Sequence, residues 1–253
     1  MPMVEANGLQ VAYTAEGDGP PLIVLHEAGS TGAVSLGPAV DGLSARFGVY
    51  RADARGHGGT RWDAADGFTT ADLVADVIAF ADALGLGAFH LLGFSMGATT
   101  ALNVAAAHAA RLRSLVVIGI SPDREPRARV ARHALDPERI ERADPDWARR
   151  LDARHDPVQG PRAWHRLLPA IAADVEDQRL LTAAEIHAIE VPTLVACGDR
   201  DPFVPVGHAW ALARGLPDAR LLVAPGCGHE LPRERPAILA AAIDAFQEEE
   251  TSP

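Results

Sequence analysis

The stretch that decides the fold of this chain is LLGFSMGA, which occupies positions 91–98. Apolar residues precede it and small residues follow it, a pattern that predicts a buried strand, a sharp turn and a helix over Met96–His108. Gly93 and Gly97 lie two residues on either side of Ser95. A serine at such a turn has a strained backbone and a raised hydroxyl, and glycine is needed where side chains would collide with the neighbouring strand and helix.

The same turn leaves the first N–H groups of the following helix without intrahelical partners. The N–H of Met96 then points to the place where an oxyanion would form if the hydroxyl of Ser95 attacked a carbonyl carbon. The stretch therefore predicts a site for nucleophilic attack. An ordinary turn serine is the alternative, and the rest of the chain decides between the two.

Composition restricts the partners of this site. The 253 residues include 23 basic and 34 acidic ones, and the net charge of −11 argues against nucleic acid or an anionic membrane surface as partners. The basic residues are all arginines, which excludes a Schiff-base lysine and a Walker A lysine. Two cysteines, Cys197 and Cys227, are too few for a disulfide framework. Met1–Gln10 shows no signal-peptide pattern and no apolar run has membrane-spanning length, so we expect a cytoplasmic protein.

Short apolar runs alternate with helical patterns along much of the chain. The expected elements are a hairpin over Val4–Tyr13, strands over Leu22–Leu25, Phe47–Ala52, Phe89–Gly93, Leu115–Ile120, Thr193–Cys197 and Arg220–Ala224, and helices over Met96–His108, His208–Arg214 and Arg235–Phe246. A helix capped by Thr69 or Thr70 precedes the central strand. Repeated strand–helix units predict an α/β fold with a mostly parallel, doubly wound sheet.

Strand-like runs disappear between Ser121 and about Glu190. Residues 123–166 hold 11 arginines and 9 acidic residues, a mixture typical of a solvated helical face rather than of a polyanion site. We interpret residues 121–190 as a helical cap, inserted over the carboxyl-terminal edge of the sheet. Residues 1–120 and 191–253 then form the core domain.

Three loops that follow predicted strands carry Ser95, Asp201 and His229. Because the carboxyl ends of parallel strands line one crevice, residues this distant in sequence can meet there. Their order along the chain is that of a Ser–Asp–His triad on such a sheet. Asp199 is a rival of Asp201, with an Asx-type turn in its own loop as the alternative role.

These motifs resemble those of the α/β-hydrolase superfamily, specifically of small bacterial esterases and lactonases with a short helical cap. The resemblance covers Val4–Phe246 and rests on GFSMG at 93–97, DxRGHG at 53–58, GxxDxxxP at 198–205 and Gly228–His229. It implies an α/β-hydrolase fold in which Ser95 is the nucleophile. His229 is then the general base and later the acid, and Asp201 holds the imidazole in the correct tautomer.

A small-residue loop, His26–Gly32, follows the predicted strand over Leu22–Leu25 and can offer a second N–H towards Ser95. The resemblance assigns the oxyanion to the backbone N–H groups of Met96 and Ala28. The family usually has glycine where this chain has Glu27. We hypothesise that this carboxylate lies beside the pocket and disfavours acidic substrates.

We interpret His26 and His57 as structural residues that bond loop backbone. Cys227 is expected to be a small buried filler. No histidine follows His26 at metal-ligand spacing and no GxGxxG follows a strand, so we expect neither a metal nor a dinucleotide cofactor.

The cap offers weaker candidates for the substrate pocket. His155 and Trp164 could line it, as could His165 and Leu168, although a place in the cap's own core fits each equally well.

The leading interpretation is a cofactor-free serine hydrolase that cleaves a small-molecule carboxylic ester or lactone through an acyl-serine intermediate. Two alternatives stay open: a hydrolase of the same fold that cleaves carbon–carbon bonds, and a ligand-binding protein with vestigial activity. The sequence predicts neither a specific substrate nor an oligomeric state.

Overall fold

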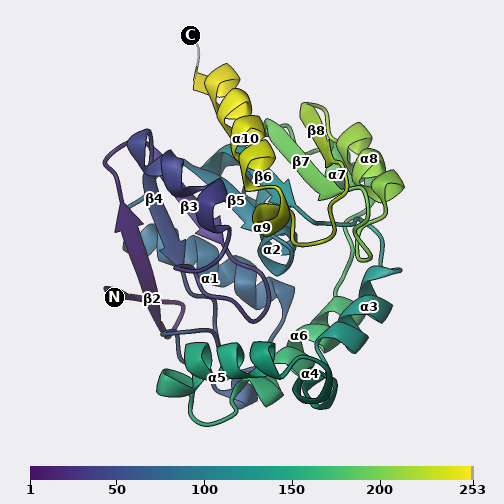
Figure 1. Ribbon diagram of the computed structural model, residues 1–253. Helices are drawn as coiled ribbons and strands as arrows, with labels where there is room; N and C mark the ends of the chain where they lie inside the picture. The colour runs from purple at the N-terminus through teal and green to yellow at the C-terminus, as the bar shows by residue number, and fades with distance from the viewer. Residues whose placement is uncertain (252–253) are drawn as a thin grey trace.

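An eight-stranded sheet forms the centre of the protein (Figure 1). This computed structural model describes residues 1–251, with side-chain surroundings through residue 248. The strands are β1 (Met3–Ala6), β2 (Leu9–Glu16), β3 (Pro21–Leu25), β4 (Gly48–Ala52), β5 (Phe89–Phe94), β6 (Leu112–Ile118), β7 (Thr193–Gly198) and β8 (Ala219–Ala224).

The strand order is β1-β2-β4-β3-β5-β6-β7-β8. β1 pairs with β2, and β2 with β4, in antiparallel orientation. All the neighbouring strands from β4 to β8 in this order run parallel to one another. β5 and β7 are buried along their whole length, as expected of the apolar central strands of a parallel sheet. The predicted mostly parallel α/β sheet is confirmed.

Helices cover both faces of the sheet. The helices of the chain are α1 (Thr70–Ala83), α2 (Met96–His108), α3 (Arg127–Ala134), α4 (Pro137–Ala143), α5 (Pro145–Gln159), α6 (Trp164–Asp177), α7 (Ala183–His187), α8 (Val206–Gly215), α9 (Leu231–Glu234) and α10 (Pro236–Thr251). Alternate strand residues belong to two cores: Leu91 lies in the core that includes side chains of α1, α2 and α8, whereas Leu92 lies in the core that includes side chains of α10 and of the short 3-10 turns over residues 37–45. α10 crosses one face and α1 lies behind the other (Figure 1).

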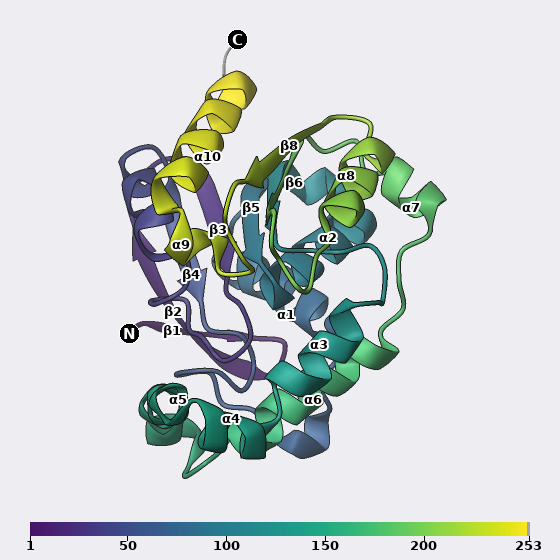
Figure 2. The same ribbon diagram turned by 45° about the vertical axis from the view of Figure 1, so that its right-hand side comes forward.

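Helices α3–α6 lie together below the sheet, apart from the helices on its faces (Figure 2). Their apolar side chains form a third core with Phe68 and Leu73 of the sheet domain. α7 behaves differently, because Ile186 packs into a main core and α7 contacts α8. The separate helical layer therefore ends with α6, before the predicted boundary at residue 190; the division into two domains stays a prediction.

Several expected boundaries were wrong. The strand predicted over Leu115–Ile120 begins at Leu112 and ends at Ile118, because its register pairs Phe89 with Leu112 and Gly119 turns the chain with φ 66°. The closing helix runs to Thr251 instead of Phe246. Within the described part of the chain, no helix is long and apolar enough to cross a membrane.

Candidate active site

Ser95 occupies the sharp turn between β5 and α2. Its φ of 54° and ψ of −111° lie in a region that side chains rarely adopt, and its N–H donates to the carbonyl of Ile118 in β6 at 2.8 Å. A Cβ on Gly93 would lie 2.2 Å from the carbonyl oxygen of Gly97, and one on Gly97 would lie 2.3 Å from that of Leu25. Both glycines are therefore required by close backbone approach, as the sequence pattern predicts.

A chain of hydrogen bonds joins the three residues that follow β5, β7 and β8. Ser95 Oγ lies 2.9 Å from Nε2 of His229, and Nδ1 of the same ring lies 2.7 Å from Oδ2 of Asp201. The other oxygen of Asp201 accepts from the N–H groups of Phe203 and Val204 at 2.7 and 3.0 Å. A carboxylate only accepts, so Nδ1 carries the proton and Nε2 is left to accept the proton of the serine.

Asp199 does not take part in this chain. Its Oδ1 accepts from the N–H of Cys227 at 3.0 Å, and bonds from the N–H groups of Gly226 and Cys227 lower the pKa of its carboxyl group. It thus joins the loop after β7 to the loop after β8 instead of forming a turn in its own loop. The geometry at His229 favours Asp201 over Asp199.

The imidazole of His229 is packed on several sides. The centroid of its ring lies 4.4 Å from the ring centroid of Phe203 and 5.3 Å from that of Phe94. A Cβ at Gly119 would lie 2.9 Å from Cε1, so glycine leaves room for the ring. These contacts limit the positions of the imidazole to those that reach Ser95 and Asp201.

A pocket of about 260 Å³ opens at Ser95. It lies between the carboxyl-terminal ends of the strands and the helical insertion, and its volume suits a small molecule. Its polar lining residues are Glu27, Ser95, Thr99, Arg127, His229 and Glu230. Its apolar lining consists of Ala28, Met96, Ala131, Ala134, Leu135, Trp147, Ile171, Val175 and Phe203.

Glu27 and Ala28 border this pocket as expected, but the two cap candidates do not. His155 is fully buried and bonds the backbone of Gly29 and Gly58. Trp164 is also buried, and its Nε1 donates to Asp152 at 2.7 Å. The expectation that His155 and Trp164 line the pocket is wrong, because both side chains are used to pack the insertion.

The weaker candidates also lie elsewhere. Leu168 is fully buried in the core of the insertion, and His165 contacts Glu141 and Arg162. Trp147, Ile171 and Val175 line the pocket instead. Ile171 and Val175 continue the apolar stripe of α6 beyond Leu168, so the periodicity contains them, although it does not show which end of the stripe meets the pocket.

Two carboxylates lie on the same side of the lining. Glu27 accepts from the hydroxyl of Ser35 at 2.5 Å. Burial and, next, the negative charge of Glu27 raise the pKa of the Glu230 carboxyl group. The loops after β3 and β8 therefore give this part of the pocket an acidic character.

Two buried histidines, His26 and His57, hold the loop that contains Ala28. His26 accepts from the N–H of Ala54 at 2.9 Å and donates to the carbonyl of Glu27 at 2.8 Å. His57 accepts from the N–H of Gly29 at 3.2 Å and donates to the carbonyl of Arg55 at 3.0 Å. Each ring accepts a backbone N–H with one nitrogen, which requires the neutral form. His26 and His57 are thus structural, as expected.

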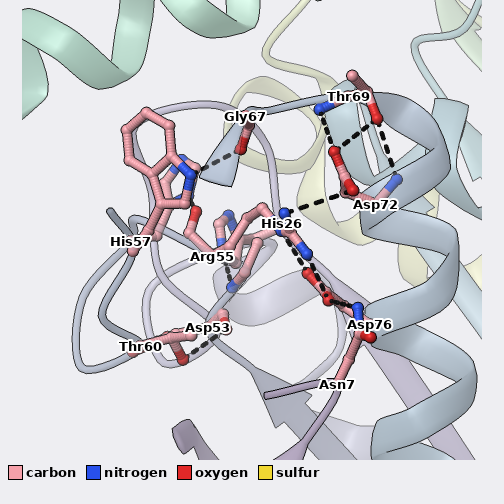
Figure 3. Close-up of polar contacts among 12 residues, drawn as sticks. Asn7, His26, Asp53, Arg55, His57, Thr60, Gly67, Thr69, Asp72 and Asp76 are labelled. Atoms are coloured by element: carbon pink, nitrogen blue, oxygen red, sulfur yellow. Dashed lines mark hydrogen bonds and ion pairs between the residues drawn. The ribbon is translucent and has the colours of Figure 1, made fainter. Parts of the chain in front are cut away.

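The same loop system is anchored to α1 by a buried ion pair (Figure 3). Arg55 donates to both carboxylate oxygens of Asp76 at 2.7 and 2.8 Å, and Asp72 lies 3.7 Å away. Asp53 accepts from the N–H groups of Gly32 and Gly59. The DxRGHG turn therefore fixes loop positions behind the pocket and contributes no lining residue.

Both cysteines are buried and free. Burial raises the pKa of each thiol to about 11, which keeps both uncharged and unreactive at neutral pH. Cys227 fills space near His229, as expected. Within residues 1–251, no group of three or more His, Cys, Asp or Glu side chains is arranged to hold a metal ion.

Comparisons with known proteins agree with this geometry. The sequence model described as "Alpha/beta hydrolase family" matches residues 22–242. N-formylmaleamate deformylase of Pseudomonas putida is 36% identical over 115 residues, which are 46% of this chain and 43% of that protein. The chain thus spans less than half the length of that relative.

Two other proteins are similar over nearly the whole chain. A pimeloyl-[acyl-carrier protein] methyl ester esterase of Nitrosomonas europaea is 28% identical, with 91% of this chain and 96% of that one aligned. The enol-lactonase from Burkholderia xenovorans LB400 superposes with a TM-score of 0.77 at 25% identity, covering 98% of this chain and 100% of that one. The matched family model, the sheet and the Ser95 turn together show that this chain belongs to the alpha/beta hydrolase family.

Proposed function

We propose that this protein is a serine hydrolase that cleaves a carboxylic ester or lactone. The observation that carries the proposal is the hydrogen-bonded chain Ser95–His229–Asp201 at the pocket, with Ser95 at the start of α2. Relatives whose names denote a methyl ester esterase and an enol-lactonase support the same bond type. We further propose that the substrate is a small molecule and that the protein is cytoplasmic. In this proposal it needs no cofactor and binds neither nucleic acid nor a membrane.

In the first half of the reaction, Ser95 Oγ attacks the carbonyl carbon while Nε2 of His229 takes its proton. The imidazolium that forms is stabilised by the carboxylate of Asp201. The backbone N–H groups of Met96 and Ala28 would donate to the oxyanion, and such a donor contributes on the order of 3 kcal/mol to transition-state stabilisation. His229 then returns the proton to the leaving alkoxide, which departs as the alcohol.

The second half of the reaction uses the same residues. Water attacks the acyl-serine, His229 accepts its proton, and the tetrahedral intermediate again places its oxyanion at Met96 and Ala28. Collapse of that intermediate releases the carboxylic acid and restores the hydroxyl of Ser95. Apart from the substrate and water, these reaction steps use only groups of the protein chain itself.

The test is hydrolysis of a panel of p-nitrophenyl esters from acetate to dodecanoate, together with lactones and simple amides, by the wild type and by Ser95→Ala. We expect turnover of esters or lactones that is lost in Ser95→Ala and retained in Ser44→Ala, a serine remote from the pocket. The chain-length optimum then measures the pocket. Absence of turnover on every ester and lactone by a folded protein would overturn the proposal in favour of carbon–carbon cleavage or ligand binding.

A further inference from the structure

One charged side chain in the pocket wall forms no salt bridge with any carboxylate of the described residues. Arg127, at the start of α3, is 7% exposed, and no carboxylate of the described residues lies within 4.0 Å of its guanidinium. Its Nη1 donates to Thr99 Oγ1 at 3.2 Å, and its buried Nε has no hydrogen-bond partner. The buried acid Asp174 attracts this guanidinium only from beyond salt-bridge distance, and its carboxylate accepts from the N–H and hydroxyl of Thr70 at 2.8 and 2.7 Å.

This arrangement is costly without an additional anion. Removing a guanidinium from water is unfavourable unless a negative group compensates it. Burial lowers the pKa of Arg127 to about 10, which still leaves the side chain protonated at neutral pH. The charge is thus retained in a wall where the guanidinium would be the counterion of a ligand anion.

The position of Arg127 relative to the nucleophile follows from α2. Its partner Thr99 lies four residues after Ser95, and the N–H of Thr99 donates to the carbonyl of Ser95 at 3.0 Å. Four residues of an α-helix rise about 6 Å. Arg127, Thr99 and Ser95 all line the same pocket, so a substrate held at Ser95 can reach the guanidinium with a short chain.

The carboxylates of the pocket lining distinguish the part around Arg127 from the rest of the pocket. Glu27 and Glu230 come from the loops after β3 and β8, and each would repel a carboxylate. Ala131 and Ala134, on the same helix as Arg127, give the wall beside it an apolar surface. An anionic substrate group is therefore directed away from the acidic side and towards Thr99, so the repulsion expected of Glu27 determines where an acidic substrate binds and does not exclude one.

We propose that Arg127 and Thr99 form an anion subsite of the Ser95 pocket, and that the substrate is an ester or lactone bearing a carboxylate. This inference rests on the proposed function. Arg127 would bind the carboxylate through the terminal nitrogens of its guanidinium while the scissile carbonyl lies at Ser95. The hydroxyl of Thr99 holds the guanidinium in place.

The experiment compares each anionic ester with its neutral amide isostere. Monomethyl succinate, glutarate and adipate are paired with methyl succinamate, glutaramate and adipamate, and 3-acetoxypropanoate with 3-acetoxypropanamide for a charge on the alcohol side. The quantity measured is the ratio of kcat/KM for the anion to kcat/KM for the amide. Both substrates of a pair are measured with the same variant, so a loss of folded protein lowers both kcat/KM values equally. Such a loss therefore cancels in the ratio.

We expect the wild type to favour the anion in at least one pair. Loss of a charged hydrogen bond should lower that ratio by roughly ten- to a hundredfold in Arg127→Met, and less in Arg127→Lys. Arg132→Met is the matched control, since Arg132 lies on α3, is exposed and pairs with Glu176 outside the pocket. Its ratio should equal that of the wild type.

Two results would overturn the inference: a wild-type preference for the amide in every pair, or an unchanged ratio in Arg127→Met. If Arg127→Met does not fold, Arg127→Lys and Thr99→Val replace it, and unchanged ratios in both would have the same meaning. If the wild type cleaves no ester, the proposed function fails separately. Calorimetric titration with glutarate then tests the subsite alone, with binding expected in the wild type and a loss of at least about tenfold in Arg127→Lys.

Discussion

His155 of the helical insertion donates from Nε2 to the carbonyl oxygen of Gly29 at 3.3 Å. Its Nδ1 accepts from the N–H of Gly58 at 3.0 Å, which places the proton on Nε2. Arg154, the preceding residue, donates to the same Gly29 oxygen at 3.0 Å. Since Gly29 follows Ala28, the insertion is bonded directly to the segment proposed to present the second oxyanion donor.

Replacing His155 by alanine should therefore impair catalysis through Ala28 as well as lower stability. The N–H of Gly58 would lose its buried partner, at a cost of about 1–3 kcal/mol in the free energy of unfolding. We expect kcat on a good ester to fall by roughly tenfold or more, because the oxyanion donor loses its positioning. KM should change less, since His155 does not line the pocket.

His165→Ala is the control for this variant, because His165 lies in the same insertion but bonds Glu141 and Arg162 and not the loop that contains Ala28. Steady-state kinetics and thermal unfolding of both variants separate the two effects. A folded His155→Ala enzyme with wild-type kcat would show that His155 only packs the insertion and does not position Ala28.

Stability should decrease as the pH falls below neutrality. Burial lowers the pKa of His155 and of His90 from 6.5 to about 4, and it also lowers the pKa of His57 well below its usual value. Between about pH 6.5 and 4 the unfolded chain binds more protons, so the free energy of unfolding rises with pH and is lost on acidification. Each such histidine should contribute a loss of about 2 kcal/mol between pH 7 and 5.

Denaturant unfolding at pH 7, 6 and 5 measures this dependence, in a range above the usual titration of exposed carboxylates. His155→Gln keeps a donor and an acceptor but has no titration, so its stability should depend less steeply on pH than that of the wild type. The same pH dependence in both proteins would mean that His155 does not remain neutral in the fold.

The buried pair of Arg55 and Asp76 should be important for stability although neither residue lines the Ser95 pocket. Both side chains are nearly inaccessible to solvent, and Arg55→Met would leave the carboxylate of Asp76 buried without a cation. We expect a loss of about 3–5 kcal/mol in the free energy of unfolding. Arg132→Met, which removes an exposed pair with Glu176, should cost less than about 1 kcal/mol. Equal midpoints in chemical denaturation for the two variants would contradict this assignment.

The sequence predicted the fold well where local pattern determines it. The helix at Met96–His108 has the predicted bounds, since GFSMG specifies the turn and the alanines that follow favour a helix. The strand after it was placed about three residues too late. Its start is determined by register with Phe89 on β5, a non-local contact that the apolar run itself does not show.

The cap residues of the site could not be predicted in the same way. Helical periodicity places Trp164 and Ile171 on one stripe, but only the packing of α6 against α5 buries the first and exposes the second to the pocket. Likewise, Arg127 and Arg132 belong to one charged stretch. Nothing local distinguishes the buried guanidinium from the exposed one.

Glu27 stands where the family usually has glycine, and its charge should act on substrate choice. Glu27→Gln keeps an acceptor for the hydroxyl of Ser35 but removes a negative charge beside Glu230. Kcat/KM for carboxylate-bearing esters should then rise by several-fold relative to their amide isosteres, because repulsion at the acidic side is reduced. The effect is opposite in sign to that of Arg127→Met, so the double variant should show an intermediate ratio.

Glu16→Gln is the control for the change in net charge, since Glu16 is exposed at the end of β2, away from the pocket lining. Its anion-to-amide ratio should match that of the wild type, whereas a rise equal to that in Glu27→Gln would assign the effect to the overall field of the protein. The salt dependence provides a second criterion. A local carboxylate in a half-enclosed pocket is screened less than a surface charge, so the Glu27→Gln effect should persist at 0.5 M salt, where the Debye length is only about 4 Å.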